Sequence, residues 1–131
     1  MVPAQHRCPH LSTGSPFEAA AGYSRAVVSG NRCHVAGTTG YDDARMTMPP
    51  DVVQQARNAL ATIAQTLQQA GFGMDDVVRA CYIVTDRAHV APVFAVLAQV
   101  FADIRPAATM IIAGLIEPDM KVGIEDTAER G

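Results

Sequence analysis

The amino-acid sequence predicts an α+β fold in which the elements follow the order β-β-α-β-α-β-β and both helices lie on one face of a sheet. Two patterns support this prediction. Apolar residues recur at spacings of three and four in two long segments, which is typical of amphipathic helices. Short apolar runs bounded by Gly, Pro, Asn and Asp lie around them and are typical of strands. With 49% apolar and 18% charged residues, residues 1–131 are expected to form a single domain with its own core.

The first two strands are expected at residues 23–28 and 33–38, on either side of the turn signal Gly30-Asn31. The chain before them, residues 2–22, is interrupted by prolines and glycine and is expected to be loop. Its beginning, residues 1–11, is expected to be a loose tail, because terminal segments of this composition are usually weakly held.

The clearest helix is predicted over residues 53–70, because six apolar side chains share one face there. Asp51 is a suitable N-cap, and Gly71 is a suitable residue just past the C-terminal end. A second helix is expected from about residue 89 to residue 103. It ends before Pro106, because the residue that precedes a proline avoids the helical region.

The remaining strands are expected at residues 77–84, 108–115 and 121–128. The first two of these are apolar on both faces, so each face needs a covering layer. Two helices cover one face of the sheet, and the sequence offers no third helix for the other. The second face is therefore expected to pack against further copies of the chain in a closed homo-oligomer, whose subunit number these patterns do not fix.

The charge pattern bears on the partners of the chain. Ten Lys and Arg residues against thirteen Asp and Glu residues give a net charge of −3, and no basic run occurs. Such a chain is a poor electrostatic partner for the phosphate backbone of nucleic acid. No apolar run approaches the roughly 18 residues that a membrane-spanning helix needs. Neither nucleic acid nor a membrane is therefore expected as a partner.

The three cysteines, Cys8, Cys33 and Cys81, are too few and odd in number, so they do not form a disulfide framework. Residues 1–16 also lack an apolar stretch of signal-peptide length. Together these features favour a reducing, cytoplasmic location. The potential metal ligands within residues 6–10 fit no standard zinc-binding spacing, so no metal site is expected.

No strong catalytic motif occurs in the sequence. Glu125 lies in the last predicted strand, with Val122 and Ile124 on the opposite face. A carboxylate in that place is solvated, paired with a cation, or set in an intersubunit cleft as a general base, and spacing alone does not choose between these. The polar residues that stand out are Tyr23, Arg25, Arg79, Arg105, Thr109 and Glu125.

Several stretches spread over residues 12–128 share the pattern of one protein family. The most specific are Arg105-Pro106-Ala107-Ala108-Thr109-Met110 and Lys121-Val122-Gly123-Ile124-Glu125. Others are Gly22-Tyr23-Ser24-Arg25-Ala26-Val27, Val35-Ala36-Gly37-Thr38, Ala70-Gly71 at the end of the first helix, Asp76-Val77-Val78-Arg79 and Tyr82-Ile83-Val84-Thr85-Asp86. With these stretches the chain resembles the RidA/YjgF family, also labelled endoribonuclease L-PSP.

The resemblance implies a fold like that of bacterial chorismate mutase, a mixed sheet backed by two helices. It also implies a homotrimer with a barrel-like core and three clefts between subunits, each for a small-molecule ligand. The well-known members of the family hydrolyse reactive enamines and imines to 2-keto acids and ammonia. They use no metal and no cofactor, so none is expected here.

The resemblance also implies roles for individual residues. In the deaminating members the strand after the second helix begins Pro-Ala-Arg, and the arginine binds the substrate carboxylate. This chain has Ala108 at that position, followed by Thr109 and by Met110, where a cysteine is frequent. The glutamate that helps to place the attacking water is matched by Glu125, and the pocket tyrosine by Tyr23. The chain thus resembles a branch without the carboxylate-binding arginine, and it is expected to hydrolyse 2-iminoacids weakly.

Two functions remain open. The first is hydrolysis of an imine, an enamine or a related small molecule in the intersubunit cleft, and the alternative is a trimer that binds a metabolite or regulates a partner without turnover. Ribonuclease activity is disfavoured by the acidic charge and by the lack of a histidine pair for acid–base cleavage. In the first function Glu125 is catalytic, and the expected substrate-binding residues are Tyr23, Ala108, Thr109 and Met110, with Arg25 and Arg105 as replacements for the missing arginine.

Overall fold

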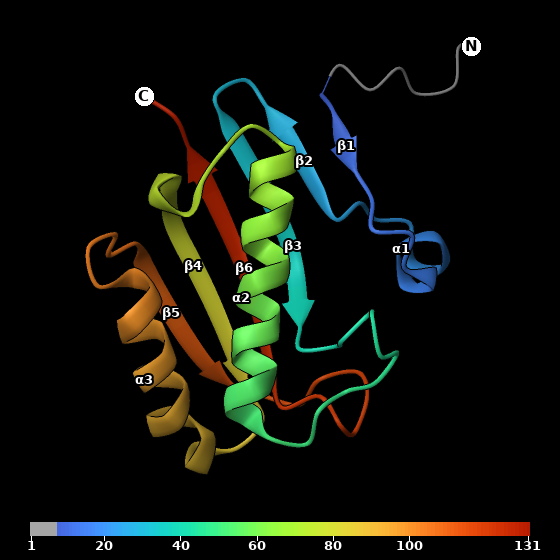
Figure 1. The fold of residues 1–131 in the computed structure, drawn as a ribbon, viewed down its shortest axis with the longest axis vertical. Helices are drawn as coiled ribbons and strands as arrows, with labels where there is room; N and C mark the ends of the chain where they lie inside the picture. Colours follow the sequence, from blue (N-terminus) through green and yellow to red (C-terminus); the bar gives the residue numbers. More distant parts are fainter. Residues whose placement is uncertain (1–7) are drawn as a thin grey trace.

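The computed structural model describes residues 8–131, which form one six-stranded sheet with two long helices packed side by side on one of its faces (Figure 1). The strand order is β1-β2-β3-β6-β4-β5. Only the pair β4 and β5 is parallel within the described sheet, so the sheet is mixed, as expected. The strands are β1 (His10–Leu11), β2 (Ala26–Ser29), β3 (Arg32–Thr39), β4 (Val77–Val84), β5 (Ala107–Ile112) and β6 (Val122–Glu129).

Helix α2 (Val52–Gln69) confirms the clearest of the predicted elements. The Asp51 side chain accepts a hydrogen bond from the backbone N–H of Gln54 at 3.0 Å and so caps the first turn. Gly71 follows the helix with a φ of +83°, a conformation that glycine adopts at little cost. The apolar face of α2 packs on β3 and β6.

Helix α3 (Val90–Phe101) confirms the second predicted helix, with a short 3-10 turn at Arg87–His89 before it. It buries Val93, Val96 and Leu97 against the core and packs beside α2. It links the parallel strands β4 and β5, which cannot be joined by a tight turn.

The segment before β2 differs from the expected loop. Helix α1 (Pro16–Ala21) begins at the N-cap Ser15 and ends at Gly22, which has a φ of +70°. Proline is favourable at the first helical position, because its missing N–H has no partner there in any case. The prediction that the chain offers no third helix is therefore wrong, although α1 is short and lies beside the sheet edge that β1 and β2 form (Figure 1).

The prediction of a loose tail over residues 1–11 is wrong at its C-terminal end, where the chain joins the sheet. His10 and Leu11 form β1 and pair with Val27 and Ala26 of β2. Two backbone bonds extend this pairing, from the Val28 N–H to the Pro9 carbonyl and from the Arg25 N–H to the Leu11 carbonyl. Residues 1–7 lie outside the described part of the chain.

The core lies between the sheet and the pair α2 and α3, and it includes one polar side chain of structural importance. Gln55 is fully buried. Its amide nitrogen donates to the carbonyl oxygens of Pro49 and Asp119, and its amide oxygen accepts from the Lys121 N–H, all within 2.9 Å. This one side chain therefore joins the loop after β3 to the loop before β6.

The sheet face opposite α2 and α3 keeps apolar side chains at the surface of the single chain. Ile111 of β5 is 47% exposed there, next to Ile83 of β4. This agrees with the expectation that a further layer covers that face. Within residues 8–131 no helix combines the length and the apolar character that a membrane crossing needs.

Candidate functional site

The register of the sheet places two rows of side chains on the face that carries no long helix. Residues directly opposite each other on paired strands project to the same face, and alternate residues of a strand share a face. The first row crosses five strands and the second crosses three. The first row is His10, Val27, His34, Thr127 and Arg79, and the second is Glu125, Cys81 and Thr109.

A pocket of about 920 Å³ lies on this face. Both rows contribute to its wall, through His10, His34, Arg79, Cys81 and Glu125 among others. The segment from α1 to the start of β2 forms another part of the wall, with Glu18, Gly22, Tyr23 and Ser24. The pocket therefore brings together Tyr23 and Glu125, two of the residues that the sequence singled out.

Glu125 is exposed in the pocket. Within residues 8–131 it makes no hydrogen bond or ion pair, so the paired alternative from the sequence does not hold in the single chain. A free carboxylate on a pocket wall can accept a proton from water or orient it.

Asp126, next to Glu125, lies on the other side of the sheet. It is opposite Val35 of β3 and Ala80 of β4, both core residues, and only 3% of it is exposed. Neither carboxyl oxygen has a hydrogen-bond partner in the structure. Burial raises the pKa of this carboxyl from 3.8 to about 7, and the negative charge of Glu125 adds to the rise.

Arg25 does not reach the pocket. It is 8% exposed, and its Nη2 donates to the Gly37 carbonyl at 2.7 Å, at the bulge where the pairing of β3 with β6 shifts between Val35 and Thr38. Burial lowers the pKa of its guanidinium, against the opposing effect of acidic groups that include Glu18. Arg25 therefore stabilises the bulged part of β3 through this hydrogen bond.

Glu18 lies at the pocket wall near Arg25 and is itself largely buried. Its carboxylate accepts from the hydroxyl and the backbone N–H of Thr13, at 2.7 and 3.2 Å. Burial acts to raise the pKa of Glu18, but these bonds, one from Ser12 and the attraction to Arg25 outweigh it, so that pKa lies below its usual value. The group holds α1 to the preceding loop.

Strand β5 carries three of the expected substrate-binding residues, and their side chains lie on different faces of the sheet. Thr109 lies on the same face as Glu125, whereas Ala108 and Met110 lie on the face of the helices, opposite Ala80 and Tyr82 of β4. Met110 packs against the core and does not fill the pocket. In a single chain, Ala108 and Glu125 are therefore on opposite sides of the sheet.

Arg105 lies at the end of α3, away from the pocket. It has a φ of +51°, and its Nε donates to the Ala102 carbonyl at 3.1 Å, which closes the last turn of the helix. Neither Arg25 nor Arg105 therefore takes the place of the missing arginine within one chain.

The pocket also contains residues that the sequence analysis did not assign to it. They are Arg79 and Cys81 of β4, His34 of β3 and His10 of β1. His10 and His34 flank Val27 in one row, and His10 Nδ1 lies 2.9 Å from the Ser24 hydroxyl. Two histidines therefore line the same pocket, but β2 lies between their strands, so the structure does not show them as an acid–base pair.

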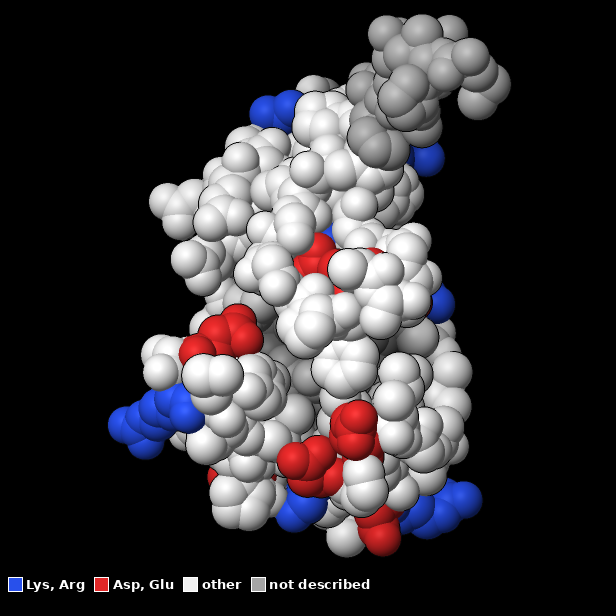
Figure 2. Space-filling view, turned by 90° about the vertical axis from the view of Figure 1, so that its right-hand side faces the viewer, with Lys and Arg blue, Asp and Glu red and all other residues white. Residues whose placement is uncertain are grey.

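Figure 2 shows the side of the molecule that carries α1 and the loop after β3. Acidic groups gather toward its lower half next to basic ones, and the described part of this face has no broad basic patch. Among residues 8–131, no three His, Cys, Asp or Glu side chains are grouped closely enough to hold a metal ion.

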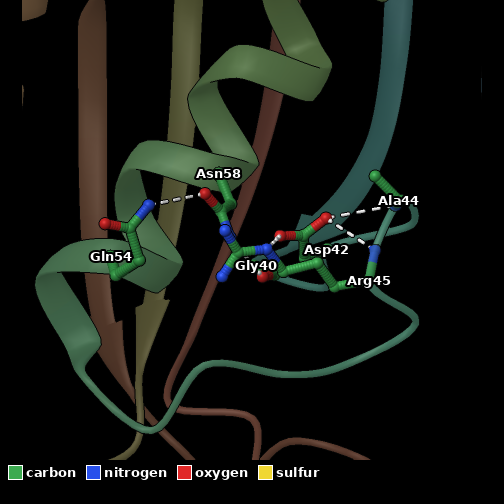
Figure 3. Close-up of polar contacts among 6 residues, drawn as sticks. All are labelled: Gly40, Asp42, Ala44, Arg45, Gln54 and Asn58. Carbon is green, nitrogen blue, oxygen red and sulfur yellow. Dashed lines mark hydrogen bonds and ion pairs between the residues drawn. The ribbon is translucent and has the colours of Figure 1, made fainter.

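A second, smaller pocket of about 510 Å³ lies between the loop after β3 and the first turns of α2. Its polar groups bond to one another, as Figure 3 shows. Asp42 accepts from the N–H groups of Ala44 and Arg45, and Asn58 bonds to both Gln54 and the Gly40 carbonyl. These hydrogen bonds fix the loop after β3 against the first turns of α2.

Comparison with known proteins places the chain in a family. Residues 13–130 match the family model described as Endoribonuclease L-PSP. SCO2049, an uncharacterized protein of Streptomyces coelicolor, is 30% identical over 122 residues, which are 92% of this chain and 91% of that protein.

Solved structures agree with this. Rv2704 of Mycobacterium tuberculosis, a member of the YjgF/YER057c/UK114 family, has 42% identity and a TM-score of 0.85, over 94% of this chain and 99% of that one. NMB1025 of Neisseria meningitidis, from the YjgF family, shares the fold with a TM-score of 0.80 at 23% identity, over 98% of both chains. The chain belongs to the endoribonuclease L-PSP family, the family also called YjgF, UK114 and RidA.

Proposed function

We propose that this protein hydrolyses a small imine, or the enamine that gives rise to it, in the pocket on the helix-free face of the sheet. The observation that carries the proposal is the unpaired carboxylate of Glu125, exposed in a pocket that it shares with the Tyr23 side chain. Membership of the RidA/YjgF family supports the same reaction class.

The proposed reaction needs one water and one carboxylate. Glu125 accepts a proton as the water oxygen attacks the carbon of the protonated imine, and the C=N bond becomes a C–N single bond in a neutral carbinolamine. Glu125 then gives this proton to the nitrogen, the C–N bond breaks and ammonia leaves, and the hydroxyl proton of the carbinolamine passes to Glu125 as the carbonyl forms. An enamine enters this sequence after protonation at carbon gives the imine. Tyr23 offers a hydroxyl that holds the substrate by a hydrogen bond.

The proposal includes a cytoplasmic homotrimer whose neighbouring copy closes the pocket. Two observations support this part. The pocket is open on the single chain, and Ile83 and Ile111 extend an apolar surface beside it. A copy packed on this face removes the apolar surface from water and encloses the reacting groups.

An assay that generates imines in place tests the proposal. A pyridoxal-phosphate lyase or an amino-acid oxidase supplies the imine, and keto-acid release is followed above the spontaneous rate over a panel of anionic and neutral imines. We expect acceleration of at least one imine and its loss, by a hundredfold or more, in Glu125→Gln, since an amide cannot take the proton. Glu129→Gln is a matched control on the same strand, because Glu129 pairs with Arg32 outside the pocket.

Acceleration that Glu125→Gln leaves unchanged contradicts the role of Glu125. A lack of acceleration for every imine, together with saturable binding of the corresponding keto acid, contradicts hydrolysis and is the result expected of a trimer that binds a metabolite without turnover.

A further inference from the structure

Arg79 is the arginine that the pocket itself presents. The other arginines near the sheet are used elsewhere: Arg25 is bonded to the Gly37 carbonyl and Arg105 to the Ala102 carbonyl. Arg32 pairs with Glu129, and Arg130 lies over the ring of Phe72. Arg79 is therefore the arginine of this group that can meet a ligand on the helix-free face.

A hydrogen bond positions the Arg79 side chain, but no acidic group in the described part of the chain neutralises its positive charge. Its Nη2 donates to the Thr109 hydroxyl at 2.9 Å, across the parallel pair β4 and β5. It forms no ion pair within residues 8–131, although Glu125 lies on the same face one diagonal step away. A guanidinium carries five N–H donors, so one bond to a neutral hydroxyl leaves most of its donors and all of its charge available.

We propose that Arg79 and Thr109 form an anion subsite that binds the carboxylate of a small carbonyl or imine compound in this pocket. An arginine fork binds a carboxylate through two charge-assisted hydrogen bonds, and the Thr109 hydroxyl fixes the orientation of the fork. The subsite takes over the function of the arginine that deaminating members carry at the position of Ala108. It lies on the face of the sheet opposite to Ala108. The binding of a carboxylate does not depend on the proposed function. Only the assignment of a carbonyl or imine group to the other end of the ligand rests on it.

The strand spacing indicates which carboxylates fit. Thr109, Cys81 and Glu125 follow one another across three neighbouring strands. Two strand spacings separate the α-carbons of Thr109 and Glu125 by roughly 10 Å. A carboxylate held over Thr109 and a carbon attacked beside Glu125 therefore belong to a molecule with several bonds between them. A 2-iminoacid, whose carboxylate is bonded directly to the reacting carbon, is too short to use both groups well.

Calorimetric titration with keto acids, the product analogues, tests the subsite without any turnover. The probe is 4-oxopentanoate, and its neutral amide and pyruvate are the comparisons. We expect 4-oxopentanoate to bind at least tenfold more tightly than its amide and more tightly than pyruvate. Arg79→Gln should remove this advantage, Arg79→Lys should keep part of it, and Thr109→Val should weaken it several-fold. Arg57→Gln removes the same charge from the exposed face of α2 and should change nothing.

Thermal unfolding and light scattering check that each variant keeps its fold and assembly. Equal binding of 4-oxopentanoate and its amide by the wild type, or unchanged binding in Arg79→Gln, overturns the subsite. Pyruvate bound as tightly as 4-oxopentanoate overturns the remote carboxylate. The proposed function fails separately: if Arg79→Gln abolishes anion binding while no imine is hydrolysed, the subsite stands and the hydrolase does not. If Arg79→Gln hydrolyses an anionic imine as fast as the wild type does, the hydrolase stands and the subsite does not.

Discussion

Glu125 and Cys81 lie directly opposite each other on β6 and β4, and both side chains leave the sheet on the face that α2 and α3 do not cover. Their sequence separation is large, so only the antiparallel register brings them together. A shift of one residue in that register would turn Glu125 into the core and Asp126 into the pocket. The position of the carboxylate in the site thus depends on the whole pairing of β6.

The assembly prediction is a stable trimer. The helix-free face exposes apolar groups, including Ile111, that a neighbouring copy would remove from water. Light scattering on the purified protein at micromolar concentration should give three times the mass of the chain. A stable monomer at that concentration would contradict both the assembly and the enclosed cleft.

The Ala108 position predicts weak hydrolysis of the 2-iminoacids derived from serine and threonine. Loss of a bidentate arginine clamp, with each bond to a charged group contributing about 1.5–3 kcal/mol, lowers kcat/KM tenfold to several hundredfold relative to members with Pro-Ala-Arg. Ala108→Arg should recover part of this rate in the coupled assay. Adding Glu125→Gln should remove the recovered rate again.

The outcome of that experiment also reports on the assembly. Ala108 and Glu125 are on opposite faces of one chain, so a gain from Ala108→Arg requires the arginine of one copy to reach the glutamate of another. Wild-type rates equal to those of a Pro-Ala-Arg member would contradict the expectation of a weak enzyme.

Gly40 predicts a strong effect on stability. A Cβ atom at this position would lie 2.3 Å from the Gln55 Cα and 2.5 Å from its carbonyl oxygen, and backbone atoms cannot move aside cheaply. Gly40→Ala should therefore lower the free energy of unfolding by about 2–3 kcal/mol. Gly37→Ala is the matched control, because a Cβ there meets nothing within 4 Å. Equal unfolding midpoints for the two variants in urea would contradict the packing of Gly40 on α2.

Asp126 predicts that stability depends on pH. Burial raises the pKa of its carboxyl from 3.8 to about 7, so the folded chain binds this proton more tightly than the unfolded chain does. An acid of this kind favours folding at low pH, and the advantage falls as the pH rises from about 4 to about 7 and is then lost. Asp126→Asn stays neutral and should be more stable than the wild type at pH 8, by a few kcal/mol in order of magnitude.

Comparing the stability of the wild type with that of Asp126→Asn at pH 4 and pH 8 separates the effect of Asp126 from that of other titrating groups. At pH 4 the two proteins should unfold at nearly the same urea concentration, because the wild-type carboxyl is then protonated in the folded state. A stability difference that is the same at pH 4 and pH 8 would show that Asp126 does not titrate in this range.

The elements that the sequence predicts well are those whose signals are local. Helix α2 has five turns of apolar periodicity and a cap at each end, and β4 lies between two short 3-10 helices, Met74–Asp76 and Arg87–His89. Helix α1 has only six residues, fewer than two turns, and shows no period. Strand β1 has two residues, and its pairing with β2 depends on residues some 15 positions away. Such contacts leave no local pattern to read.

The same distinction applies to the site. Tyr23 and Glu125 were expected in the pocket, and the structure brings both to its wall. Arg79 stood out in the sequence, but its place beside Thr109 follows from the parallel register of β4 and β5. Alternation along β6 shows that neighbouring residues face opposite sides, yet only the packing of the core identifies Asp126 as the buried carboxyl.

A crystal structure of the protein soaked with 4-oxopentanoate at a saturating concentration tests whether the helix-free face, with Glu125 and Tyr23, is the substrate site. We expect electron density for the ligand in this pocket, with the carbonyl carbon beside Glu125 and a second copy of the chain closing the pocket. Ligand density confined to the smaller pocket between the loop after β3 and α2, or none on the helix-free face, would contradict this expectation.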